Sequence, residues 1–253
     1  MDFLTALFQN GEGYSAINTA RSALSTFFIN ESGLTIGKYP SVKRLLKGIF
    51  KLRPSLPRYN CIWDVNIVLD FLKNFYPYEG MELSILTKKL VMLLALASAQ
   101  RVQTLQVLKV EDVCFKENLV IIPINELIKQ STPYRNKFQI KLETYEKEPA
   151  ICVVTILKAY LVRTEELRSS SQLLISFQKP FEAVSKQTIS RWIKSVMFEA
   201  GIDTEIFKSH STRSAVCSKA KASYVPIENI LETAGWSNAR TFKKFYDKVI
   251  IEC

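Results

Sequence analysis

Four side chains near the end of the chain could together act on a phosphodiester. The single histidine, His210, stands three residues before Arg213, Trp236 follows a glycine, and Tyr246 comes ten residues later. Arginine stays charged and can bind two phosphate oxygens, and a tyrosine hydroxyl can attack phosphorus to give a covalent intermediate. We therefore interpret this order as a site for DNA strand cleavage and rejoining through a phosphotyrosine, with Tyr246 as the nucleophile.

Each of these residues also has an ordinary alternative role. His210 could begin a helix or be a satisfied buried histidine, and Arg213 could be a surface cation. Gly235 before Trp236 suits a helix end followed by a core residue, and Tyr246 could pack with neighbouring aromatic rings. The order and spacing of all of them together favour the chemical interpretation.

The chain carries a large excess of positive charge. Lys and Arg number 34 against 24 acidic residues, which gives a net charge of +10 and a pI of about 9.3. Such an excess suggests a polyanionic partner, although a surface adapted to solubility is the alternative. Between Ser32 and Trp63 there is no acidic residue, whereas these basic residues occur: Lys38, Lys43, Arg44, Lys47, Lys51, Arg53 and Arg58. This clustering favours double-stranded DNA as the partner.

The cysteine and histidine content and the hydropathy of the chain argue against several other classes of protein. The five cysteines are widely spaced without a C-x-x-C pair and only one histidine is present. Neither a disulfide framework nor a metal site is indicated, and no cofactor is expected. The longest apolar run, residues 90–99, is too short to span a bilayer, and the N-terminus lacks the basic start of a secretory signal. We expect an intracellular protein of the cytosol or nucleus.

The first part of the chain predicts a small helical domain. Apolar spacing indicates helices over residues 14–30, 40–52 and 64–75. The segment Tyr76–Gly80, with its proline and glycine, then breaks the helical pattern. We therefore predict one domain over residues 1–78 and a larger one over residues 79–253.

The second domain is expected to be mainly α with a small antiparallel β-sheet, an α+β fold. An apolar helix is predicted over residues 83–97. Strands are indicated at residues 113–115, 119–123 and 138–142, with turn chemistry at 132–136. Helices are expected at residues 153–163, 188–200, 211–222, 226–234 and 237–246, and residues 173–176 suit a strand or an extended stretch. His210 and Arg213 then flank a helix start, where a phosphate binds favourably.

With these elements in place, the chain resembles the tyrosine recombinase, or phage integrase, superfamily. The run Leu94–Leu105 looks like the box around the family's first arginine, here Arg101. Lys129 falls at the end of the second strand, where the family places a mobile lysine, and the H-x-x-R, Gly-Trp and Tyr motifs complete the set in family order. The resemblance covers nearly the whole chain. It implies a helical core-binding (SAM-like) domain followed by a tyrosine-recombinase catalytic domain.

Four short motifs resemble a narrower group of relatives. They are Ile-Lys-Gln-Ser at 128–131, Ile-Ser-Arg-Trp-Ile-Lys at 189–194, His-Ser-Thr-Arg at 210–213 and Ala-Gly-Trp-Ser at 234–237. These look like recombinases of eukaryotic mobile elements, the DIRS and Crypton types. The likeness implies a transposable element as the source and the nucleus as the place of action.

The resemblance assigns a role to each catalytic position. Arg101 and Arg213 would clamp the non-bridging oxygens of the scissile phosphate, and His210 would donate a hydrogen bond to the same phosphate. Trp236 would donate its indole N–H, which is the only polar group of that ring. Tyr246 would attack the phosphate, and no metal would take part.

The same resemblance makes Lys129 the general acid that protonates the leaving oxygen. Lys137 and Lys141 lie on the same predicted hairpin, where lysines are commonly solvated surface residues. The chain departs from many relatives at Thr104, where an acidic residue is usual, although a hydroxyl also forms hydrogen bonds. The tail after Tyr246 is shorter than the element that relatives dock onto a neighbouring subunit.

Two basic sets are expected to contact DNA, which the resemblance implies is clamped between the two domains. Their members are Lys43, Arg44, Lys47 and Lys51 in the first domain, and Lys186, Arg191 and Lys194 in the second. Phosphate contacts of this kind give affinity that depends on salt and not on sequence. Family members work as tetramers on DNA, so a homotetramer on DNA, with a monomer when free, is the expectation.

The predicted function is a metal-independent site-specific DNA recombinase or integrase with a 3′-phosphotyrosyl intermediate. A type IB topoisomerase shares the fold type and much of the chemistry but acts as a monomer. A non-catalytic DNA-binding protein derived from a recombinase is the other alternative. The compact helical first domain and the Gly-Trp pair before Tyr246 favour the recombinase, and the intact catalytic positions argue against the derived protein.

Overall fold

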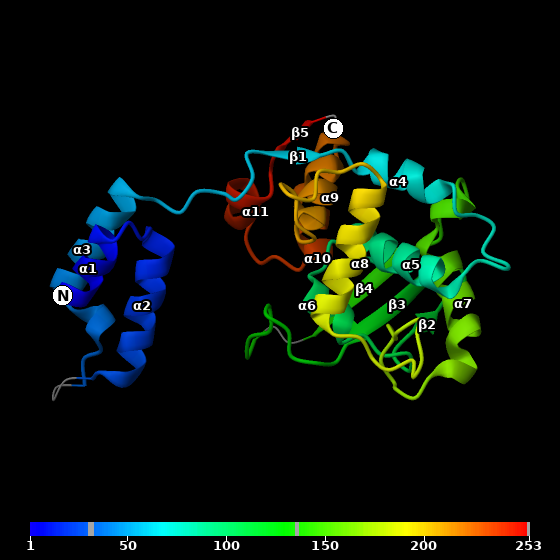
Figure 1. Ribbon diagram of the computed structural model, residues 1–253, viewed down its shortest axis with the longest axis horizontal. Helices are drawn as coiled ribbons and strands as arrows, with labels where there is room; N and C mark the ends of the chain where they lie inside the picture. The colour runs from blue at the N-terminus through cyan, green and yellow to red at the C-terminus, as the bar shows by residue number, and fades with distance from the viewer. Residues whose placement is uncertain (30–32, 135–136, 252–253) are drawn as a thin grey trace. The chain divides into compact units, whose positions relative to one another are not determined.

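The chain divides into two compact units, residues 1–58 and residues 59–253 (Figure 1). The structure, a computed structural model, describes residues 1–29, 33–134 and 137–251. The predicted boundary after residue 78 lies well beyond this division. The reason is that helix α4 (Val65–Lys73) buries its apolar face in the core of the larger unit.

The smaller unit is built from helices and a short 3-10 turn. In chain order these are α1 (Asp2–Gln9), α2 (Tyr14–Phe27), η1 (Ile36–Lys38) and α3 (Pro40–Leu52). α3 has the predicted bounds, because Pro40 suits a first helical turn and Val42, Leu46 and Ile49 bury one face in the unit's core. α2 ends earlier than predicted, and residue 30 of that prediction lies outside the described residues. α1 was not predicted.

Helix α5 (Leu83–Ser98) forms the centre of the larger unit. Its side chains are buried almost all round, because α7 (Val153–Thr164), α8 (Lys186–Glu199), α9 (Ser211–Ala222) and the sheet pack against it. A helix in this position needs no polar face, which explains the nearly unbroken apolar run in the sequence. Ala99, with a φ of +50°, ends the helix just before Gln100 and Arg101.

An antiparallel sheet, which the sequence predicts, packs against α5. Its strands β2 (Cys114–Phe115), β3 (Leu119–Ile124) and β4 (Phe138–Glu143) lie in that order. Ile122 pairs with Ile140, and alternate residues of β3 and β4 are buried, which is the period of two seen in the sequence. The last two residues of the predicted turn at 132–136 lie outside the described residues. Residues 173–176 contribute an isolated bridge through Ile175.

The remaining helices complete the larger unit. They are α6 (Val102–Gln106), α10 (Ile227–Ala234) and α11 (Ala239–Phe245), with the 3-10 turns η2 (Pro149–Ile151) and η3 (Glu165–Leu167). α9 has the predicted bounds, α10 and α11 begin slightly later than predicted, and α6 was not predicted. None of the helices in the described ranges is long and apolar enough to cross a membrane.

A parallel pair of short strands joins the two ends of the larger unit. β1 (Cys61–Trp63) pairs with β5 (Val249–Ile251), and the two strands lie side by side in Figure 1. Neither strand was predicted, because each holds only three residues and its partner lies far away in the sequence. The short tail after Tyr246 therefore forms a strand within its own unit.

Candidate active site

The start of α9 carries two of the predicted catalytic residues. His210 directly precedes the helix, and Arg213 lies in its first turn. A buried hydrogen bond holds this start, because Trp63 Nε1 donates to Ser211 Oγ at 2.9 Å. The first turn is therefore fixed by packing against β1, at the other end of the unit's sequence.

Arg213 is buried, with 3% of its surface exposed. Burial, and after it the charge of Arg101, lower the pKa of its guanidinium to about 10, so the side chain stays charged at neutral pH. Its Nη2 donates to the Ala234 carbonyl, but Nε and Nη1 have no hydrogen-bond partner within the described ranges. A buried cation with unpaired N–H groups is costly unless an anion completes its contacts.

Trp236 and Tyr246 lie against this guanidinium. The guanidinium carbon of Arg213 is 4.4 Å from the Trp236 ring and 5.6 Å from the Tyr246 ring, and the two ring centroids are 4.4 Å apart. Trp236 is buried, and its Nε1 has no partner among the residues that the structure describes. The structure thus brings three predicted catalytic residues from separate elements into direct contact.

A turn at Gly235 places Trp236 in this cluster. Gly235 ends α10 with a φ of +68°, and the Trp236 N–H donates back to the Leu231 carbonyl. Other residues adopt this left-handed conformation at a cost. A Cβ on Gly235 would also lie 3.1 Å from Nε2 of Gln130. Glycine is therefore favoured here by the backbone angle, and a Cβ would also need the end of the Gln130 side chain to shift slightly.

The segment that carries Tyr246 is tied to α9 on both sides of the tyrosine. Ser218 Oγ donates to the Tyr246 carbonyl at 2.7 Å and accepts a hydrogen bond from the Lys248 N–H at 3.0 Å. Lys221, also on α9, forms an ion pair with Asp247. One helix therefore positions Arg213 and the backbone of the predicted nucleophile together.

Arg101 directly precedes α6, three residues after the end of α5, and its Nη1 is buried without a partner in the described structure. Beside it, Gln100 donates from Nε2 to the Thr233 carbonyl at 2.7 Å. Both polar side-chain atoms of Gln130 are also buried and unpaired within the described residues. Sequence reasoning missed these two glutamines, whose only signal is that they adjoin Arg101 and Lys129. Together they pack around the Gly235 turn.

Lys129 has no hydrogen bond to the other predicted catalytic residues in the described part of the chain. It is exposed, in a turn closed by a hydrogen bond from the Ile128 N–H to Ser131 Oγ. Lys137 and Lys141 are exposed as well. The hairpin therefore presents several lysines to solvent and does not single out one of them.

His210 is also exposed, and one face of its ring meets Tyr59. The ring centroids are 5.6 Å apart, with 30° between the ring planes. The imidazole is therefore accessible to a substrate but bordered on one side by an aromatic ring. Thr104, the departure from the family pattern, is buried in α6.

Arginines, and not acidic or cysteine ligands, provide the charge of this site. Over the described ranges, no group of three or more His, Cys, Asp and Glu side chains is arranged to hold a metal ion. Four cysteines in those ranges, Cys61, Cys114, Cys152 and Cys217, are free thiols.

A known family accounts for this arrangement. The model of the phage integrase family matches residues 68–250, a span that includes all six predicted catalytic positions. The chain belongs to the phage integrase family. Among curated proteins, none matches the sequence.

Solved structures of recombinases share the fold of this phage integrase family member. The post-cleavage complex of the XerH site-specific recombinase with palindromic difH matches with a TM-score of 0.62 at 15% identity, over 95% of this chain and 65% of that one. The Tn1549 transposon integrase with transposon right-end DNA gives 0.63 at 12% identity, over 96% and 78%. A lambda integrase dimer on a COC′ core site gives 0.54 at 14%, over 97% and 62%. The chain thus spans about two thirds of the XerH chain.

In the smaller unit of this family member, the predicted DNA-binding residues lie on α3. Lys43, Arg44, Lys47 and Lys51 are all exposed. Lys43 and Lys47 line a shallow hollow of the unit together with Tyr14 and Arg21. The sequence-predicted basic face is therefore available to an anionic partner.

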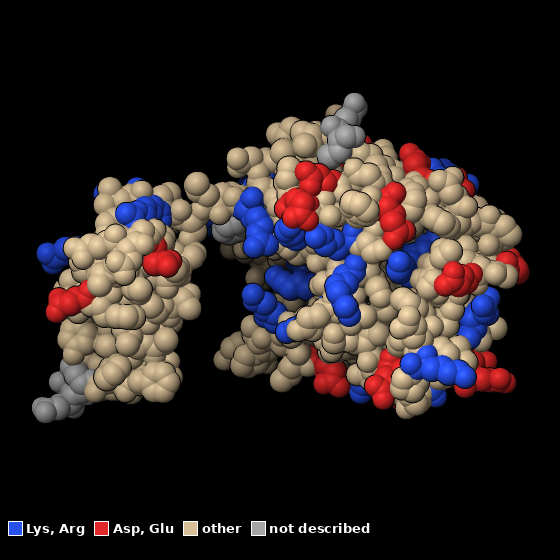
Figure 2. Space-filling model, viewed as in Figure 1, with Lys and Arg blue, Asp and Glu red and all other residues tan. Residues whose placement is uncertain are grey.

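In the larger unit, the second basic set lies on α8. Lys186 and Arg191 are exposed, and Arg191 donates to Thr188 Oγ1 at 3.2 Å. Lys194 is half-buried and forms an ion pair with Glu205 at 3.3 Å. Figure 2 shows Lys and Arg side chains gathered on the near face of this unit, over the region of α8, α9 and α11.

Proposed function

We propose that this phage integrase family member is a site-specific DNA recombinase that works through a 3′-phosphotyrosyl intermediate. Tyr246 attacks a backbone phosphate, becomes linked to the 3′ end and releases a 5′ hydroxyl. A 5′ hydroxyl from another duplex then attacks the phosphotyrosine, forms a new phosphodiester and releases the tyrosine. The number of phosphoester bonds is conserved, so the cycle needs no external energy source.

The observation that carries this proposal is the contact of Tyr246 with a buried group of unpaired donors. Arg213 Nε and Nη1, Arg101 Nη1 and Trp236 Nε1 all lack partners in the described structure. Leaving one buried donor unpaired costs about 1–3 kcal/mol, so a group of them indicates a ligand that accepts several hydrogen bonds. A phosphodiester has the required oxygens, and fixed donors stabilise the charge that it gains in the transition state.

His210 and Lys129 complete the proposed chemistry by handling hydrogen bonds and protons. His210, one helical turn from Arg213, donates to the phosphate and assists proton removal from the tyrosine. Lys129 protonates the leaving 5′ oxygen, a step worth roughly 10²–10⁴ in rate. Its exposed turn must then approach the phosphate when DNA is bound. The two arginines supply the positive charge, and no metal is needed.

The proposed substrate surface combines the two basic helices. Exposed Lys43, Arg44, Lys47 and Lys51 on α3, and Lys186, Arg191 and Lys194 on α8, bind backbone phosphates of double-stranded DNA. In this proposal the smaller unit is the core-binding domain and binds the same duplex as the catalytic unit.

We further propose that the recombinase serves a eukaryotic mobile element of the DIRS or Crypton type, acts in the nucleus and assembles as a homotetramer on DNA. The motif likeness at residues 128–131, 189–194, 210–213 and 234–237 supports the element type. The fold shared with a transposon integrase and with a lambda integrase tetramer bound to a Holliday junction is consistent with this setting.

A covalent trapping assay tests the proposal. Nicked duplex suicide substrates, pooled to include candidate element ends, are incubated with the protein in EDTA. The wild-type protein should form a protein–DNA adduct, and Tyr246→Phe should form none. Tyr224→Phe is the matched control, because Tyr224 is the nearest tyrosine in sequence and is 94% exposed. This variant should keep the wild-type yield.

Other outcomes separate the alternatives. An adduct that persists in Tyr246→Phe would refute this nucleophile. Tight DNA binding without any adduct would favour a non-catalytic DNA-binding protein. Relaxation of supercoiled DNA without strand transfer between duplexes would favour a type IB topoisomerase.

A further inference from the structure

The segment around β1 holds the start of α9 from two sides. Trp63, the last residue of β1, donates its buried indole N–H to Ser211, directly after His210. Tyr59, two residues before β1, contacts the turn directly before His210. The predicted catalytic histidine is therefore bracketed by two aromatic residues of one short segment.

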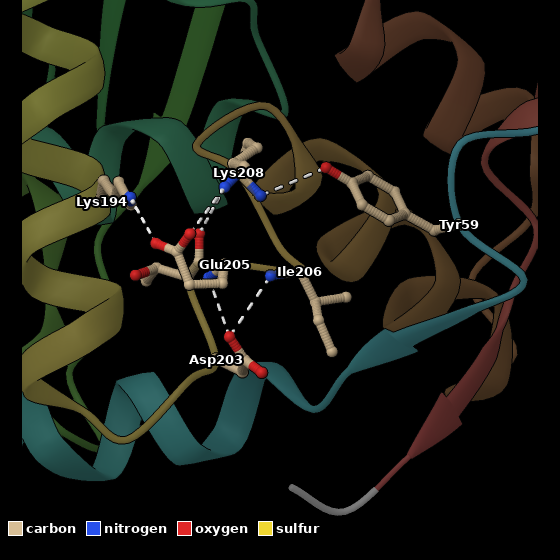
Figure 3. Close-up of polar contacts among 7 residues, drawn as sticks. Tyr59, Lys194, Asp203, Glu205, Ile206 and Lys208 are labelled. Carbon is tan, nitrogen blue, oxygen red and sulfur yellow. Dashed lines mark hydrogen bonds and ion pairs between the residues drawn. The ribbon is translucent and has the colours of Figure 1, made fainter.

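Tyr59 makes three contacts at this place. Its hydroxyl accepts a hydrogen bond from the Lys208 N–H at 3.2 Å, a contact drawn in Figure 3. Its ring lies 5.5 Å from the buried ring of Phe207 and 5.6 Å from the ring of His210, measured between centroids. The planes of Tyr59 and His210 differ by 30°, so the two rings meet in a tilted arrangement. Tyr59 thus touches both the backbone and the rings of the segment that carries His210.

The turn is also held by contacts that do not involve Tyr59. Asp203 Oδ1 accepts hydrogen bonds from the N–H groups of Glu205 and Ile206, at 2.8 and 3.3 Å. Glu205 also pairs with Lys194 of α8 and with Lys208, as Figure 3 shows. These contacts hold the backbone of the turn but do not touch the imidazole. Tyr59 lies against one face of the exposed His210 ring and limits its orientation from that side.

We infer that Tyr59 is a positioning residue that holds the imidazole of His210 in the orientation needed to reach the scissile phosphate. This inference rests on the proposed function, in which His210 donates to that phosphate. A ring that is free to rotate about its side-chain bonds spends less time in a productive geometry, and small misplacements of a reacting group have large effects on rate. Tyr59 acts through His210 and does not itself contact the reacting atoms.

The contact of Tyr59 with His210 can be read directly, because His210 is the only histidine of the chain. Protein labelled with ¹³C at histidine Cε1 gives one resonance, which needs no assignment. Tyr59→Leu removes the aromatic ring, so the His210 resonance should lose its ring-current shift and move downfield. Tyr59→Phe keeps the ring and should leave the resonance near its wild-type position. Phe75→Leu is the control, since Phe75 is another half-buried aromatic residue of this unit, in edge contact with Phe71.

The same variants are then compared in single-turnover cleavage of the suicide substrate at saturating DNA. Tyr59→Leu should lower the cleavage rate roughly tenfold while the Kd for DNA stays within about twofold. Tyr59→Phe and Phe75→Leu should stay within about threefold of the wild-type rate. An unchanged His210 resonance in Tyr59→Leu, or a rate loss no greater than that of Phe75→Leu, would overturn the inference. Failure of the proposed function would instead appear as no adduct with the wild-type protein, and the resonance would still report the contact.

Discussion

Two buried cations of the larger unit, Arg213 and Lys89, have similar surroundings but differ in their charge state and hydrogen bonding. They are 3% and 1% exposed, respectively. Each lies against an aromatic ring, with the Arg213 guanidinium 4.4 Å from Trp236 and Lys89 Nζ 4.9 Å from Tyr78. Burial is the main cause that lowers both pKa values, to about 10 for Arg213 and about 8 for Lys89.

The difference lies in what each cation still has to offer. The Lys89 amine donates to the Phe75 carbonyl, and with a pKa of about 8 it is mostly charged at pH 7 and loses that charge just above neutral pH. Arg213 remains charged at that pH and keeps two guanidinium nitrogens, Nε and Nη1, without a hydrogen-bond partner in the described structure. Arg213 therefore keeps N–H donors that can bind an anion. Lys89, although equally buried, uses its amine in a hydrogen bond within the fold.

The largest effect on the cleavage rate is expected when Arg213 is replaced. Arg213→Ala should lower the single-turnover cleavage rate by about 10³-fold, because the transition state loses a fixed bidentate donor. Arg213→Lys should still lose about 10²-fold, because an amine cannot bind two phosphate oxygens in the same geometry. Suicide-substrate cleavage measures both rates.

Arg163→Ala is the matched control for these variants, because Arg163 is an exposed arginine in the last turn of α7. Its cleavage rate should change by less than about twofold. If Arg213→Lys kept half of the wild-type rate, the bidentate role of Arg213 would be excluded. Circular dichroism checks that each variant is folded.

The lysine side of the comparison predicts a pH dependence of stability. The pKa of Lys89 is about 8 in the folded state and is ordinarily 10.5, so the unfolded state binds more protons between these values. The free energy of unfolding should therefore rise with pH in this window, by roughly 2–3 kcal/mol relative to Lys89→Met. Urea unfolding from pH 7 to pH 10 measures this difference.

Lys88→Met serves as the control on the same helix, since Lys88 is half-buried and paired with Glu199. It should keep the pH slope of the wild-type protein. Parallel curves for the wild type and Lys89→Met would show that the buried amine does not titrate in this range.

The turn that shapes the arginine's surroundings gives a smaller effect. Gly235→Ala should destabilise the protein by about 1–2 kcal/mol through its left-handed backbone, with a further contribution from contact with Gln130. Gly201→Ala is a matched control, because Gly201 has a φ of +93° and no atom lies within 4 Å of a Cβ built there. Urea unfolding of both variants should show the larger loss for Gly235→Ala. Addition of Gln130→Ala should recover the excess, and no recovery would locate the strain elsewhere.

Replacing an exposed cation should have the smallest effect, in contrast to replacing a buried one. Lys47→Gln should weaken DNA binding by about two- to threefold and reduce the slope of log K against log salt by about 0.9. The cleavage rate at saturating DNA should not change. Fluorescence anisotropy over a series of salt concentrations measures the slope. The control is Lys116→Gln, which changes an exposed lysine between β2 and β3 and should leave the salt slope unaltered. If both variants changed the slope equally, α3 would not be a DNA-binding surface.

Local patterns in the sequence predict the helices and the sheet well. α3 and α9 have the predicted bounds, because their apolar spacing and their end signals lie within the helices themselves. β1 and β5 could not be predicted, since three residues carry no periodicity and their pairing depends on the whole unit between them. The domain boundary is placed earlier than predicted for a related reason. The break at Tyr76–Gly80 is a real turn, but α4 before it packs with the larger unit.

The candidate site could be predicted only where a motif carries it. Spacing alone indicates Arg213, Trp236 and Tyr246, which the structure brings into contact. It does not indicate Gln130 or Tyr59, because their roles come from packing between distant segments. Lys129 remains a prediction, since its turn is exposed in the structure.

The parallel pairing of β1 with β5 also determines how the larger unit carries mechanical load. Tension that enters the unit before Cys61 and leaves it after Ile251 pulls the two strands from opposite ends of the pair. Their evenly spaced hydrogen bonds are then loaded together in shear and are not peeled apart one by one. The segment carrying Tyr246 should therefore stay anchored under stretching until all the hydrogen bonds between β1 and β5 break together.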